Sequence, residues 1–211
     1  MKHEWRKAEK ELYLAKIKPT LLEIPEMKFI TITGKGNPNQ DDYAQRIAAL
    51  YPIAYNLRFK LKRGELAGAA FEYTVYPLEG LWTQEDYDPL GPLNKDLFVY
   101  KLMIRQPAQV TQEDFQLAKE EALKKSGHPL IKEVAFETYT EGQVAQIMHH
   151  GPYDDEAASF DLLEAFMAEQ GLERQWIMDE YVHREIYLSD PRRVPPEKYK
   201  TTLRLRVREK R

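Results

Sequence analysis

The chain has 211 residues, of which 43% are apolar and 11% aromatic, so it can bury a core as one large domain or as two small fused ones. Its 31 basic and 34 acidic residues give a formal charge of −3, which provides no overall positive field for a polyanion, and we expect no nucleic acid partner. It has no cysteine, which excludes disulfides and thiol nucleophiles, and no apolar run near the ~20 residues that cross a bilayer, so we expect a cytoplasmic protein without a membrane partner.

The N-terminal region, residues 1–27, is highly charged and is interrupted by Pro19 and Pro25. Because proline breaks helices, we expect an N-terminal arm that lies on the body of the protein. The β-branched, apolar residues 28–33 then predict a strand, and the glycines, proline and asparagines of residues 34–39 predict a turn that ends in a helix cap.

Apolar side chains at steps of three and four predict a helix over residues 40–62. An aromatic ridge of Tyr51, Tyr55 and Phe59 lies beside the apolar face of this helix, and Pro52 is expected to kink it. Two interpretations of the ridge stay open, since aromatic residues at this spacing pack in a core or line a binding site.

Alternating side chains predict a strand over residues 69–76, with Phe71 and Tyr73 on one face. Residues 77–82 predict a turn, and residues 97–105 predict the next strand. The first half of the chain is therefore expected to form a unit of strand, helix, strand and strand.

The second half is expected to repeat this order. A capped helix over residues 111–126 connects the halves, and residues 133–139 and 143–149 predict a β-hairpin around Glu141 and Gly142. A helix with apolar residues from Ala157 to Met167 follows, closed by Gly171.

Residues 181–191 predict a strand whose two faces differ. Alternation places Tyr181, His183, Glu185 and Tyr187 on one face, and a mostly aliphatic set on the other. We expect the aliphatic face to pack against a helix-covered core, which leaves the Glu185 face to line water or a pocket.

Residues 201–208 predict the last strand, which completes two similar units. We therefore predict an α+β fold of duplicated strand-helix-strand-strand modules, about 28–107 and 130–211, within a single domain over residues 28–211. The modules are expected to be related by pseudo-two-fold symmetry, to form an antiparallel sheet, and to hold a ligand cleft between the halves.

Five segments in this order resemble the GyrI-like small-molecule-binding family, and more narrowly its stand-alone bacterial members. They are Gly34-Lys-Gly-Asn-Pro-Asn39, Tyr76-Pro-Leu-Glu-Gly-Leu-Trp82, Met103-Ile-Arg-Gln-Pro107, His150-Gly-Pro-Tyr-Asp-Asp155 and His183-Arg-Glu-Ile-Tyr-Leu-Ser-Asp190. The resemblance spans the chain from about Glu11 to Val207. It implies a duplicated fold whose cleft is lined by aromatic residues and one acidic residue.

The resemblance also implies a choice of functions. Relatives in the family are effector domains of multidrug-responsive activators, others inhibit gyrase, and a subfamily hydrolyses the cyclopropane ring of DNA-alkylating natural products such as yatakemycin, which protects the cell. The acidic pocket residue of the family corresponds to Glu185, and Trp82 corresponds through its Pro-Leu-Glu-Gly-Leu-Trp motif. This chain lacks a DNA-binding segment like that of the activators.

Under the hydrolase interpretation, Glu185 orients or deprotonates the attacking water, and a hydroxyl of Tyr55 or Tyr187 donates to the dienone oxygen. The other ligand-binding candidates are Trp82, Phe59, Phe71, Tyr73, Phe98 and His183. Two alternatives stay open for the protein: sequestration of planar or cationic drugs, and ligand-sensing regulation, which includes gyrase as a partner. For Glu185 itself, the alternative is an exposed strand residue paired with a basic side chain.

We expect no metal and no cofactor. His149 and His150 are adjacent, but no third ligand lies at a recognisable spacing. The acidic cluster Asp154, Asp155 and Glu156 is interpreted as charge at a helix N-terminus, where the helix dipole favours it.

Overall fold

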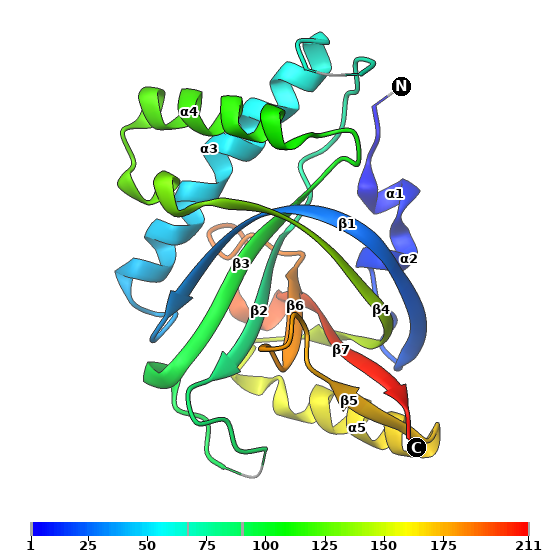
Figure 1. Cartoon of the computed structure of the whole chain (residues 1–211). Coiled ribbons are helices and arrows are strands. Elements are labelled where there is room, and N and C mark those ends of the chain that lie inside the picture. The colour runs from blue at the N-terminus through cyan, green and yellow to red at the C-terminus, as the bar shows by residue number, and fades with distance from the viewer. Residues whose placement is uncertain (1, 67, 90, 211) are drawn as a thin grey trace.

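The structure is a computed structural model that describes residues 2–66, 68–89 and 91–210. Within these ranges one sheet has seven strands, in the order β4-β1-β3-β2-β6-β7-β5 (Figure 1). The strands are β1 (Thr20–Lys35), β2 (Leu78–Gln84), β3 (Phe98–Gln106), β4 (Ala135–His150), β5 (Leu172–Gln175), β6 (His183–Tyr187) and β7 (Lys200–Glu209). Because β4 also pairs with β7, six of these strands close into a barrel-like ring.

The helices are α1 (Trp5–Ala8), α2 (Lys10–Tyr13), α3 (Asp41–Arg63), α4 (Gln112–Ser126) and α5 (Ala157–Glu169). Their bounds confirm the three longer helices expected from the sequence. In α4, the Thr111 side chain accepts a hydrogen bond from the Asp114 backbone N–H, and the Asp114 side chain accepts one from the Thr111 backbone N–H. No helix in the described part of the chain is long and apolar enough to cross a membrane.

All the strand pairs are antiparallel, as expected of the last two strands of each half. Within the first half β3 pairs with β1 and β2, and within the second half β7 pairs with β4 and β6. The halves are joined by the pairs β1–β4 and β2–β6. This scheme is unchanged when β1, β2 and β3 are exchanged with β4, β6 and β7, as an internal duplication requires; the duplication itself stays a prediction.

Helices cover the outer face of the ring. Leu50, Ile53 and Leu57 of α3 pack in one cluster with apolar residues of β1 and β3, and α4 packs on α3. Leu163 and Met167 of α5 pack on apolar residues of β4 and β7. In Figure 1, α3 and α4 lie above the sheet and α5 below it.

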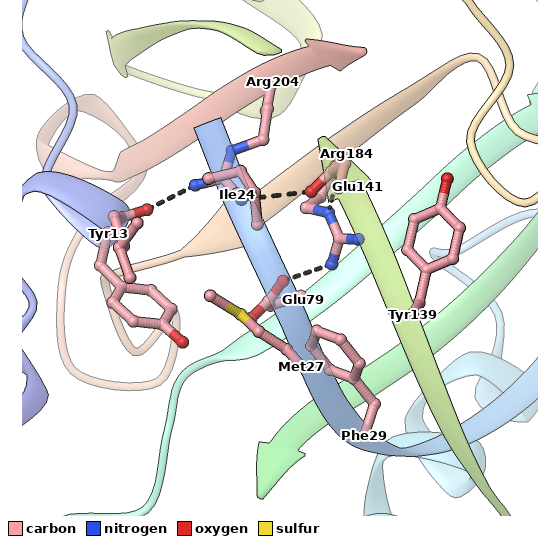
Figure 2. Close-up of a pocket in the computed structure, with 10 residues that line it drawn as sticks. Tyr13, Ile24, Met27, Phe29, Glu79, Tyr139, Glu141, Arg184 and Arg204 are labelled. Atoms are coloured by element: carbon pink, nitrogen blue, oxygen red, sulfur yellow. Dashed lines mark hydrogen bonds and ion pairs between the residues drawn. The ribbon is translucent and has the colours of Figure 1, made fainter. Parts of the chain in front are cut away.

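The inner face of the ring holds a buried charge network. Arg184 Nη1 donates to Glu79 Oε2 over 2.6 Å, and Arg184 Nε donates to Glu141 Oε1 over 3.1 Å (Figure 2). Arg204 Nη1 lies 3.4 Å from Glu141 Oε2. We expected the mostly aliphatic face of this strand to pack against helices. The structure corrects this expectation, because that face of β6, which carries Arg184, lies in the interior of the ring. The helices lie on the face that carries Glu185.

Two long strands differ from the expected pattern. β1 begins at Thr20, eight residues before the predicted start at residue 28, and contains Pro25. β4 is continuous across Gly142, where a hairpin was expected. The partners of β1 and β4 keep both chains extended, since Ile24 pairs with Gly142 on one side of Pro25 and Glu26 pairs with Thr140 on the other.

The predicted strand at residues 69–76 is wrong. Apart from a bridge between Tyr73 and His3, this segment lies outside the sheet, and the strand is β2, where a turn was expected. His3 N donates to the Glu72 carbonyl over 2.7 Å, and Thr74 N donates to the His3 carbonyl over 2.9 Å. The alternation in residues 69–76 therefore reflects packing against the N-terminal segment.

Candidate functional site

Glu185 lies at the centre of β6, between Gly80 of β2 and Leu203 of β7. Only 8% of its surface is exposed. His183 and Tyr187 are two residues away on either side, so the strand places both on the same face as Glu185. His183 Nε2 lies 2.9 Å from Glu185 Oε1, and the Tyr187 hydroxyl donates to Glu185 Oε2 over 2.8 Å. Each carboxylate oxygen is thus held in position from the same strand.

Trp82 extends this network to β2. It lies opposite His183, and its Nε1–H donates to the Tyr187 hydroxyl over 3.0 Å. Gly80 makes this contact possible, because a Cβ there would lie 2.6 Å from Trp82 Nε1 and 2.9 Å from the Tyr187 hydroxyl. A chain of hydrogen bonds therefore runs from Trp82 through Tyr187 to the Glu185 carboxylate.

Aromatic rings of α3 and β3 surround Trp82. Its ring centroid lies 5.3 Å from that of Tyr100, 5.7 Å from that of Phe98 and 5.8 Å from that of Tyr43. Burial raises the pKa of Tyr43 and that of Tyr187, so both hydroxyls remain neutral. The side of the site next to β2 is thus a set of ring faces with neutral hydroxyl groups.

The segment that leads into α5 covers the other side of Glu185. The ring centroid of Tyr153 lies 5.6 Å from that of Tyr187, and the ring centroid of Phe160 lies 4.8 Å from that of His183. Glu156 comes between Tyr153 and Phe160 in the chain and caps α5. It is 7% exposed, and its Oε1 atom is buried without a hydrogen-bond partner in the described residues.

Glu156 and Glu185 form a pair of neighbouring carboxyl groups with different environments. Burial raises the pKa of Glu156 well above its usual value, and the negative charge of Glu185 raises it further. These effects favour the protonated form of Glu156. Glu185 accepts from Tyr187, so the site contains a carboxylic acid beside a hydrogen-bonded carboxylate.

The interior of the ring leaves little room for a ligand. Its cavity has a volume of about 10 Å³ and is lined by residues of both halves, including Glu79, Glu141 and Arg184 (Figure 2). A volume near 10 Å³ holds about one water molecule. The interior of the ring is therefore too small for a planar ligand.

Comparison with protein families gives a match between residues 17–208 and the GyrI-like small molecule binding domain. The chain belongs to the GyrI-like family. Comparison with curated proteins gives no match.

Three solved structures with similar folds cover most of the chain. An uncharacterized conserved protein from Listeria innocua is 36% identical, with a TM-score of 0.87 over 98% of this chain and 100% of that one. A hydrolase from Listeria innocua is 35% identical, with a TM-score of 0.85 over 98% of this chain and 100% of that one. The C-terminal domain of EcmrR, at 14% identity and a TM-score of 0.54 over 92% of this chain and 98% of that one, shares the fold.

The GyrI-like fold brings together five of the residues predicted from the sequence. They are Glu185, His183, Tyr187, Trp82 and Phe98, and the contacts above connect them. Their roles toward a ligand stay predictions.

The other four predicted residues lie elsewhere. Tyr55 and Phe59 are 45% and 46% exposed on α3, where their rings stack on each other, because α3 uses its aliphatic ridge to contact the sheet. Phe71 and Tyr73 stack on each other beside the N-terminal segment, with His3 against Phe71.

Sequence reasoning missed the contributions of β3, of the first turn of α3, and of α5 with the segment that leads into it. The missed residues are Tyr43, Tyr100, Tyr153, Glu156 and Phe160. One signal was present: steps of three and four join residues 153, 156 and 160, which predicts a shared helical face. The acidic cluster of Asp154, Asp155 and Glu156 obscures this signal, because all three carboxylates have the pattern of charges at a helix N-terminus. Asp154 is exposed and pairs with Lys95, whereas Glu156 is buried.

Proposed function

We propose that this protein binds a planar small molecule at the Glu185 site and hydrolyses the cyclopropane ring of DNA-alkylating natural products of the yatakemycin type. The observation that carries the proposal is a nearly buried carboxylate, held by two hydrogen-bond partners, between aromatic walls from β2, β3, α3 and α5. The 35% identity to a hydrolase from Listeria innocua supports a hydrolytic reaction.

In the proposed reaction, water attacks the unsubstituted carbon of a cyclopropane fused to a dienone. Glu185 orients the water and accepts its proton, the ring carbon–carbon bond breaks, and its electron pair moves through the ring to the dienone oxygen, which becomes a phenol oxygen. The Tyr43 hydroxyl is a neutral donor at the site, whereas the Tyr187 hydroxyl already donates its proton to Glu185 and Tyr55 lies on the outer side of α3. Stacking on rings such as Trp82 contributes ~0.5–1.5 kcal/mol for each pair.

One observation favours a second candidate function, binding without turnover. Both Glu185 oxygens already have hydrogen-bond partners in His183 and Tyr187, which suits a fixed counter-charge. A charged carboxylate among ring faces is also suited to a planar cation. The protein would then sequester such drugs or sense them for a regulatory partner.

A cytoplasmic location and the absence of a nucleic acid partner stay predictions.

Incubation of the pure protein with a spirocyclopropyl dienone tests the proposal, because ring opening produces the absorbance of a phenol. We expect many turnovers per protein molecule, and a loss of ~10²–10⁴-fold in rate in Glu185→Gln. The exposed Glu197 provides the matched control, and Glu197→Gln should keep the full rate. Protection of the dienone at one equivalent, without phenol formation, would support sequestration and contradict the hydrolase.

A further inference from the structure

The carboxyl groups of Glu156 and Glu185 face each other across the boundary between α5 and β6. Tyr153 and Phe160, on either side of Glu156 in the chain, contact Tyr187 and His183, and these are the two residues that hold Glu185. Glu156 lies between Tyr153 and Phe160 in the chain, so its side chain is directed at the Glu185 carboxylate, which His183 and Tyr187 hold.

The groups around Glu156 give it the character of an acid. Glu185 faces it from β6, Asp154 precedes it in the chain, and both charges raise its pKa in addition to burial. Asp154 is itself paired with Lys95 at the surface. The buried Oε1 atom of Glu156 has no partner in the described residues, which leaves it available to a bound molecule.

We propose that the Glu156 and Glu185 pair hydrolyses aryl epoxides, with Glu185 as the base and Glu156 as the acid. The inference rests on the proposed catalytic role of Glu185 and adds a second class of substrate. In an epoxide the attacked carbon is bonded directly to the leaving oxygen, so two neighbouring carboxyl groups reach both atoms. In a fused dienone the attacked carbon and the oxygen lie across a six-membered ring, so the pair reaches one end only.

The reaction balances within the pair. A water oxygen forms a bond to the ring carbon while Glu185 takes a proton from that water. The ring carbon–oxygen bond breaks, its electron pair stays on the oxygen, and Glu156 gives its proton to that oxygen, which produces a vicinal diol. Glu185 is then protonated and Glu156 is ionised, and transfer of the proton between the neighbouring groups restores the starting state without a co-reactant.

The aromatic walls select the rest of the substrate. Trp82, Phe98 and Tyr100 offer ring faces or edges on one side of Glu185, and Phe160 offers an edge on the other. A phenyl group beside the epoxide matches these surfaces, so styrene oxide is the appropriate probe.

The experiment measures the formation of 1-phenylethane-1,2-diol from styrene oxide by the full chain. We expect turnover in the wild type and in Glu197→Gln, and a loss of ~10²–10⁴-fold in both Glu156→Gln and Glu185→Gln, with thermal unfolding used to show that each variant is folded. In the dienone assay, Glu197→Gln should keep the full rate while Glu185→Gln is inactive.

Two further readouts separate an acid from a merely structural residue. The rate of epoxide hydrolysis should fall as the pH rises through the pKa of Glu156, because the acid is lost, and Glu156→Gln should lack this fall. A single turnover in ¹⁸O-labelled water should place the label in the diol, and an unlabelled diol would overturn the proposed attack by water.

The outcomes distinguish this inference from the proposed function. Dienone opening without any epoxide hydrolysis, or full epoxide activity in a folded Glu156→Gln, would overturn the inference and leave the hydrolase of cyclopropanes standing. Loss of neither activity in Glu185→Gln would overturn both.

Discussion

Gly80 is the residue on which the contact between Trp82 and Tyr187 depends. A methyl group at this position would overlap Trp82 Nε1 and crowd the Tyr187 hydroxyl, at 2.6 Å and 2.9 Å. We therefore expect Gly80→Ala to lower the free energy of unfolding by ~1–3 kcal/mol. It should also change the tryptophan fluorescence and weaken ligand binding. Chemical denaturation of the variant measures the first effect.

The companion variant Trp82→Phe tests this cause. It removes the Nε1 atom, so the double variant should recover part of the stability lost in Gly80→Ala. If Gly80→Ala lowers the free energy of unfolding equally in the wild type and in Trp82→Phe, the crowding lies elsewhere.

Glu156 makes a second prediction at the level of a single residue. Its pKa is higher in the folded protein than in the unfolded chain, so its contribution to stability is fully present below the unfolded pKa and is lost as the pH rises through the folded pKa. Glu156→Gln removes this loss because glutamine does not ionise. The variant should gain melting temperature relative to the wild type as the pH rises above the ordinary pKa of 4.5, by ~2–4 °C for each kcal/mol. A difference that stays constant as the pH rises would contradict the raised pKa.

At the level of elements, the inner faces of β2, β4 and β6 are held together by a buried arginine. Arg184 pairs with Glu79 and Glu141, so Arg184→Met leaves Glu79 buried without its partner and leaves Glu141 with Arg204 alone. We expect a loss of ~3–5 kcal/mol in the free energy of unfolding.

Arg192 is the matched control for this change. Its side chain is 86% exposed and pairs with Asp190, so Arg192→Met should cost at most ~1 kcal/mol. Similar costs for the two variants in urea denaturation would show that the inner network does not stabilise the ring.

Elements with strong local signals could be predicted from the sequence. The apolar period and the Thr111 cap were enough for α3 and α4, whose bounds differ from the prediction by one residue. The long strands could not be predicted, because Pro25 and Gly142 interrupt strands locally and only the pairing of β1 with β4 continues across these two positions.

The residues of the candidate site also differ in how well the sequence predicts them. Alternation along β6 was enough to place His183, Glu185 and Tyr187 together. The contribution of Glu156 depends on how α5 packs against β6, which is a tertiary contact that no local pattern contains. Its acidic neighbours also gave it the appearance of an ordinary helix-terminal charge.

At the level of the whole molecule, closure of the ring makes the two halves depend on each other. In each half alone, β1 and β2, or β4 and β6, lose the partner strand that the other half supplies and become edge strands. Fragments 1–127 and 128–211 should therefore show no cooperative thermal unfolding alone, and should recover it when mixed or co-expressed. Circular dichroism measures this. A monomeric half that unfolds cooperatively would contradict the interdependence.

The central claim is that ligands meet this protein on the Glu185 face of the sheet. The most direct test is the structure of the Glu185→Gln protein with an unreacted spirocyclopropyl dienone bound. We predict that the planar ring contacts Trp82 and Phe98, with the cyclopropane carbon directed at residue 185. A ligand bound inside the ring beside Arg184, or on the exposed side of α3 at Tyr55, would contradict the account.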